Sequence, residues 1–133
     1  MQISIDPAAW TATLLGLFAV SVSIGALRQP GQFAKMVAEI GESPALQLLS
    51  GFAELFIGAV IYLINPWAAH DLLAMIMKAI GGLMMAEALV VMAISDLYFQ
   101  IWLKNLAAMR RGWPLATLVL GGALAIAGMM RFS

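Results

Sequence analysis

Charged side chains are scarce in this sequence, and cysteine is absent. Of the 133 residues 11% are charged and 63% are hydrophobic, whereas a soluble domain usually carries about 25% charged residues. The lack of cysteine excludes disulfides, thiolate metal sites and cysteine nucleophiles. Seven basic residues balance seven acidic ones without a run of like charge, which argues against nucleic-acid binding. The composition predicts a protein whose main solvent is not water.

Catalytic motifs are missing as well. The sequence contains no Walker loop, dinucleotide-binding fingerprint, nucleophile elbow or His-Glu-x-x-His zinc signature. The single histidine, His70, stands beside Asp71 without the companions that a metal site needs, so a surface role is favoured over a metal or haem site. We therefore expect no enzyme activity, no metal and no cofactor.

Long apolar segments make up most of the chain. They cover 8–27, 45–64, about 72–95 and 114–130, each near the roughly 20 residues that cross a bilayer as a helix. Aromatic residues suited to membrane interfaces stand near their ends: Trp10, Trp67, Tyr98, Trp102 and Trp113. No Lys or Arg precedes Arg28, so we expect no cleaved signal peptide. We predict one all-α membrane domain over 1–133, with four transmembrane helices in a bundle of two similar hairpins.

Basic residues gather in two connections of this plan. The segments 28–43 and 96–112 hold Arg28, Lys35, Lys104, Arg110 and Arg111, whereas the opposite side has Lys78 and Arg131. Basic loops usually face the cytoplasm, so we expect a bacterial inner membrane protein with both termini in the periplasm. Each connection also has an apolar helical face, which predicts a short amphipathic helix on the membrane surface.

The two halves of the chain share an internal pattern. One constant shift along the sequence places Pro44 on Pro114, Gly51 on Gly121, Ala53 on Ala123 and Gly58 on Gly128. We interpret this as a degenerate duplication with units at about 8–66 and 72–131, related by an axis along the membrane normal. Chance matches in glycine- and alanine-rich sequence are the alternative.

The first unit also resembles a known family. Its pattern consists of Pro30, Phe33, Lys35 and Met36, followed by Pro44, Gly51, Gly58 and Tyr62. This pattern is similar to that of the YjeT-like family of small two-helix bacterial inner-membrane proteins. The second unit departs further, because Asn105 stands where the first unit has Lys35. The resemblance implies the repeat unit and the location, and it implies no activity.

Three ionisable residues fall inside the apolar segments: Glu54, Lys78 and Glu87. Such residues are functional-site candidates by default, because an ionised group in lipid is costly. Small residues surround Glu54 at helical spacing, so we expect it to face the bundle interior, whereas bulky neighbours leave the direction of Glu87 open. For Lys78 we favour a side chain that reaches the interface, and an ion pair with Glu54 is the alternative.

Glycines on several helices predict close helix packing. They are Gly25, Gly51, Gly58, Gly81, Gly82, Gly121 and Gly122.

Three functions remain open. The first is an accessory or scaffolding subunit of a larger membrane complex, or a homo-oligomer, with lipids and other membrane subunits or itself as partners. The second is a small proton-coupled transporter or channel for a proton or cation that uses Glu54 and Glu87. The third is a site for a quinone, pigment or lipid among the aromatic side chains and glycine faces.

Overall fold

The structure, a computed structural model, describes residues 5–109 and 112–132 and is all-helical there. Its helices are α1 (Pro7–Arg28), α2 (Gln32–Glu42), α3 (Pro44–Ile64), α4 (Leu72–Ala93), α5 (Ser95–Met109) and α6 (Gly112–Met130). Helices α1, α3, α4 and α6 are long and apolar enough to cross a membrane, which confirms the predicted fold class. Of the basic residues considered above, Arg110 and Arg111 lie outside the described residues.

Side-chain caps explain where three of the spanning helices begin. Asp6, Ser43 and Asp71 each accept a hydrogen bond from the backbone N–H three residues later, at the start of α1, α3 and α4. Such caps satisfy a donor that would otherwise be unpaired at a helix start. Pro7 and Pro44 follow two of these caps, in the first turn, where proline costs no hydrogen bond.

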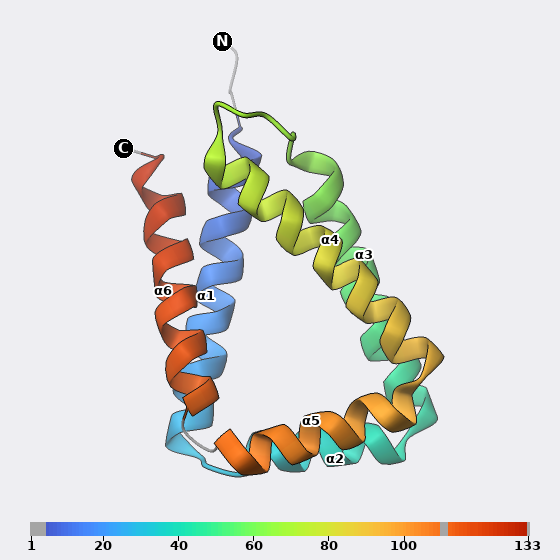
Figure 1. Cartoon of the computed structure of the whole chain (residues 1–133). Helices are drawn as coiled ribbons and strands as arrows, with labels where there is room; N and C mark the ends of the chain where they lie inside the picture. Colours follow the sequence, from blue (N-terminus) through green and yellow to red (C-terminus); the bar gives the residue numbers. More distant parts are fainter. Residues whose placement is uncertain (1–4, 110–111, 133) are drawn as a thin grey trace.

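The helices pack in pairs, and the spanning pairs join different predicted repeat units. Helix α1 packs along α6, α3 packs along α4, and α2 lies beside α5. Figure 1 shows the two spanning pairs meeting near the described chain ends and diverging from there, with α2 and α5 across the open end. The arrangement thus differs from two closed hairpins in a bundle, because α1 packs against α6 and its contacts with the α3–α4 pair lie near one end.

Glycines set the close approach within both spanning pairs. A Cβ on Gly58 would lie 2.8 Å from the Gly81 carbonyl oxygen, and one on Gly128 would lie 2.6 Å from the Ala9 carbonyl oxygen. At such distances only glycine lets the two backbones meet. The same constraint applies at Gly121, where a Cβ would lie 3.0 Å from the Gly16 carbonyl oxygen.

The junction where the two pairs meet, which we call the apex, has a small core and two polar links. Ala12, Ile61 and Met77 pack together there. The buried Asn65 donates a hydrogen bond to the Thr11 hydroxyl (3.3 Å), which ties the end of α3 to α1. Arg131, just beyond α6, contacts Asp71 at 2.7 Å and Asp6 at 3.6 Å. These contacts hold the α1–α6 and α3–α4 pairs together.

Candidate functional site

Glu54 of α3 and Glu87 of α4 meet across their helix pair. Their carboxyl groups lie close enough for the two charges to interact, and the Tyr98 hydroxyl of α5 donates to Glu87 Oε1 at 2.6 Å. A carboxylate only accepts hydrogen bonds, so two carboxyl groups bond to each other only when at least one carries a proton. The carboxyl pair, as we call Glu54 and Glu87, is therefore a place inside the membrane span where a proton can be held.

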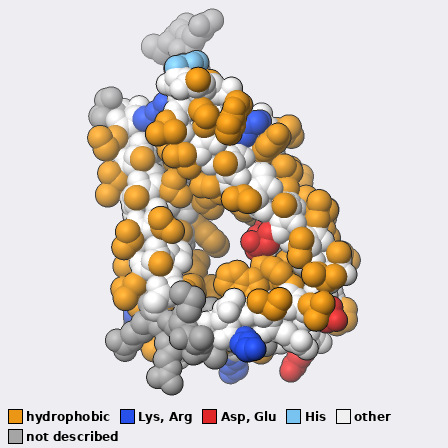
Figure 2. All heavy atoms as spheres, in the orientation of Figure 1, with side chains coloured by type: hydrophobic (Ala, Val, Ile, Leu, Met, Phe, Trp, Pro, Cys, Tyr) orange, Lys and Arg blue, Asp and Glu red, His pale blue; other side chains and the backbone are white. Residues whose placement is uncertain are grey.

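The carboxyl pair faces the space between the diverging helix pairs. Glu54 precedes Ile57 and Ile61 by three and seven residues, and Glu87 follows Met84 by three, so each shares a helix face with those residues. Ile57, Ile61 and Met84 line a pocket of about 300 Å³ together with Thr11, Leu14, Leu15 and Phe18 of α1. Figure 2 shows the hollow between the pairs, bordered by hydrophobic side chains, with an acidic group at its edge. We call this space the central opening.

An aromatic pocket lies at the open end of the molecule, beside α2 and α5, which we call the wide end. Its volume is about 290 Å³, and its lining residues come from α2, α5 and α6: Phe33, Val37, Tyr98, Phe99, Trp102, Trp113 and Thr117. Tyr98 joins this pocket to the carboxyl pair, because its ring lines the pocket while its hydroxyl bonds Glu87. Burial is the largest cause that raises the pKa of Tyr98, and the bond to Glu87 adds to it. Tyr98 therefore stays a neutral hydrogen-bond donor.

Lys78 contacts the end of α3. Its ammonium donates to the carbonyl oxygens of Tyr62 (2.9 Å) and Asn65 (3.3 Å), and it lies 3.7 Å from the centre of the Tyr62 ring. The carbonyls at a helix C-terminus lack partners within the helix and carry partial negative charge, which a cation stabilises. The alternative of an ion pair with Glu54 is not found within residues 5–109 and 112–132.

The glycines named from the sequence divide into two groups. Gly51, Gly58, Gly81 and Gly121 lie at helix contacts, and Gly82 lies at ordinary contact distance (3.6 Å) from the Tyr62 ring. Gly25 and Gly122 have open space within 4 Å of where a Cβ would stand, so neither packs against a neighbouring helix among the described residues.

Most of the expected interface aromatics also have protein contacts. Trp10 packs against Phe132 with ring centroids 5.0 Å apart, and Phe33 packs against Trp113 at 4.8 Å. Trp102 lies near Tyr98, with ring centroids 6.1 Å apart. Trp67 is the most exposed of the expected set, at 66%.

Sequence reasoning missed the partner of Tyr98. Its position near a predicted boundary indicated an interface anchor. Tyr98 follows Glu87 by 11 residues, and this spacing alone did not suggest a hydrogen bond between them. In the part of the chain that the structure describes, no group of three or more His, Cys, Asp or Glu could hold a metal ion. No family model matches this chain, and neither does a curated protein or a solved structure.

Proposed function

We propose that the protein binds a lipophilic organic cation in its central opening and exchanges it for the proton of the carboxyl pair. The observation that carries this proposal is the hydrogen bond from Tyr98 to Glu87, with Glu54 beside it. Tyr98 also lines the aromatic pocket, and the helix faces of the two glutamates continue into the apolar pocket of the central opening. An apolar pocket with a few convergent polar groups is the usual form of a small-molecule site. A small proton-coupled transporter is the activity that such an exchange would serve.

The chemistry of both halves of the site supports a cation. A carboxylate stabilises positive charge, and in a membrane span it has little water to compete with it. Tyr98 and Trp102 add aromatic faces, and such faces attract cations. When the cation enters, the shared proton leaves, so the charge of the site stays constant.

Proton release during binding tests this proposal. Tetraphenylphosphonium is added to the purified full chain in weakly buffered detergent, and both binding heat and released protons are measured. We expect close to one proton for each cation bound near neutral pH. Glu54→Gln and Glu87→Gln should each abolish proton release and weaken binding at least tenfold, the effect of removing about 1.4 kcal/mol of interaction.

A matched control separates this effect from a general change of charge. Asp96→Asn removes a carboxylate from the first turn of α5, and we expect it to bind and to release protons as the unmodified chain does. Cation binding without proton release, or equal binding by Glu54→Gln, would contradict the exchange.

A second candidate is an accessory subunit of a membrane complex, or a homo-oligomer. It is favoured by the unpacked inner helix faces: Leu14, Phe18 and Ile57 line the central opening and are 59%, 65% and 49% exposed. A helix of another subunit would cover this surface. Native mass spectrometry of protein extracted in a mild detergent tests this candidate, because it requires a stoichiometric partner chain or a second copy.

We also propose that the chain arose by duplication of a unit similar to the YjeT-like family. The support is a regularity in the glycine contacts within the two spanning pairs. Gly121 and Gly128 of α6 meet Gly16 and Ala9 of α1, while Gly51 and Gly58 of α3 meet Ala88 and Gly81 of α4. One constant shift along the sequence relates both contact positions on α1 to those on α4.

The same proposal includes the membrane and the orientation. Lys35 on α2 and Lys104 on α5 place basic residues at the wide end of the molecule. By the positive-inside tendency this end faces the cytoplasm of a bacterial inner membrane, with the termini in the periplasm. Accessibility of single cysteines introduced at His70 and Lys104 would test the orientation in intact cells.

A further inference from the structure

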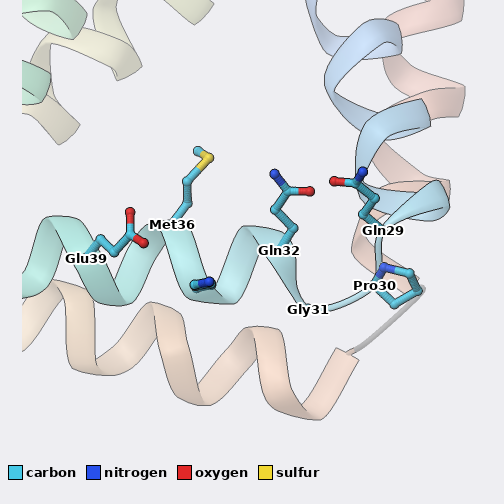
Figure 3. A pocket seen from close by; sticks show the side chains of 7 residues that line it. Gln29, Pro30, Gly31, Gln32, Met36 and Glu39 are labelled. Atoms are coloured by element: carbon cyan, nitrogen blue, oxygen red, sulfur yellow. The ribbon is translucent and has the colours of Figure 1, made fainter.

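A polar corner lies at the foot of the central opening, where α1 turns into α2. Figure 3 shows the side chains of Gln29, Gln32, Met36 and Glu39 extending to the side of α2 from which α1 rises. With Pro30, Gly31 and Lys35 they line a pocket of about 630 Å³, which we call the corner pocket. Gln32, Met36 and Glu39 are four and three residues apart, which places them on one face of α2.

An apolar groove continues from the corner pocket along α1. A second pocket of about 210 Å³ shares Gln29, Gln32 and Met36 with the first and is also lined by Val22, Gly25, Ala26 and Phe33. Gly25 offers bare backbone, since nothing lies within 4 Å of where its Cβ would be. The polar part and the apolar part together have the form of a site for an amphiphile.

The charges in the corner pocket have opposite signs and are not paired. Lys35 and Glu39 lie one turn apart on α2 and are both exposed. The ion pairs of the described residues involve neither of them. A lysine four residues before a glutamate is the weaker orientation for a helical pair, which leaves both groups available to a ligand with both charges.

We propose that the corner pocket binds a phospholipid whose head carries a phosphate and a primary ammonium, namely phosphatidylethanolamine. Lys35 and the amide N–H groups of Gln29 and Gln32 bind the phosphate, and Glu39 accepts from the ammonium. One acyl chain lies along Val22, Gly25 and Ala26. The depth agrees, because α2 begins four residues after the end of the spanning helix α1, where lipid heads lie.

Lipids that differ only in their heads test this proposal. The purified full chain is delipidated in detergent and titrated with dioleoyl phosphatidylethanolamine, phosphatidylcholine or phosphatidylglycerol, and bound lipid is counted by native mass spectrometry. We expect phosphatidylethanolamine to bind about tenfold more tightly than the other two. Phosphatidylcholine has no ammonium hydrogen to donate, and phosphatidylglycerol brings no positive charge to Glu39.

Two variants and two controls assign the preference to the corner pocket. Lys35→Gln should weaken phosphatidylethanolamine binding about tenfold, and Glu39→Gln should abolish the preference over phosphatidylcholine. Lys104→Gln and Glu42→Gln make the same charge changes outside the pocket and should bind like the unmodified chain.

Other outcomes would overturn the proposal. Equal binding of the three lipids, a preference for phosphatidylglycerol, or variants that behave like their controls would each exclude recognition of the head by Lys35 and Glu39. The lipid preference of the unmodified chain is measured without any variant, so it decides even if one variant misfolds. The carboxyl pair is not used here, and Glu54→Gln should leave lipid binding unchanged.

Discussion

At the residue scale, the hydroxyl of Tyr98 is the group whose removal is most informative. It donates to Glu87 at 2.6 Å, and a hydrogen bond to a charged group contributes about 1.5–3 kcal/mol. Tyr98→Phe keeps the ring in the aromatic pocket and removes this donor to the carboxylate that holds the cation. We expect tetraphenylphosphonium to bind about tenfold more weakly, as measured by calorimetry.

The control for this prediction is Tyr62→Phe. It removes a hydroxyl near the C-terminal end of α3, at the apex, and keeps the ring beside Lys78. We expect unchanged cation binding. An equal loss in both variants would mean that the Tyr98 bond has no specific role in binding.

Asp71 predicts how stability depends on pH. The backbone N–H of Ala74 holds the pKa of Asp71 below its ordinary value, and Arg131 contributes in the same direction. Because the folded pKa is lower than the unfolded one, this stabilisation is present above pH about 4 and is lost as the pH falls through the folded value.

Thermal unfolding in detergent measures this effect. Asp71→Asn keeps a side chain that can cap α4 but loses the charge. It should be less stable at pH 7 by up to about 1 kcal/mol and should lose less stability on acidification. Asp96→Asn should keep the acid dependence of the unmodified chain, and a variant Asp71→Asn with that same dependence would contradict the argument.

At the scale of the helices, the tight glycines determine which faces can pair. A Cβ on Gly58 would lie 2.8 Å from a backbone oxygen of α4, whereas Gly122 has open space around it. Overpacking of a tight contact costs about 1–3 kcal/mol, and alanine is favoured over glycine in an open helix by up to about 1 kcal/mol. Gly58→Ala should therefore lower the unfolding temperature, and Gly122→Ala should maintain or raise it. Circular dichroism in detergent measures both, and equal shifts would contradict the close approach.

The extents of the helices could be predicted from the sequence, because they depend on local features. Lipid excludes charge over a fixed length, and caps and prolines mark the ends, so α3 begins at Pro44 and ends just before Asn65 and Pro66. Even α2 and α5 follow from their amphipathic faces. The meeting of Glu54 with Glu87 could be expected only in part, since the face of Glu54 was indicated and that of Glu87 was not.

At the scale of the whole molecule, helix pairing could not be predicted because it is not local. Glycine faces occur on several helices, and each is compatible with more than one partner. The constant shift that aligns Pro44 with Pro114 related α3 to α6 without indicating that α3 packs on α4 and α6 on α1. The bond from Tyr98 to Glu87 depends on the direction in which α5 leaves α4 at Ile94. The central opening follows from this pairing, because the described parts of the two pairs meet near the apex and diverge from there.

The divergence of the two pairs can be measured directly, because the chain has no native cysteine that would also react with a spin label. Spin labels at Leu14 and Ile57 report the distance between α1 and α3 near the apex, and labels at Ile24 and Leu48 report it near the wide end. Helix α2 has 11 residues and connects the two helices at that end, which corresponds to about 16 Å at 1.5 Å per residue. In a closed bundle both distances would reflect an interhelical spacing of about 8–10 Å. We expect the second distance to exceed the first clearly in liposomes. Equal short distances would mean that the pairs close in the bilayer, leaving no central opening to hold a cation.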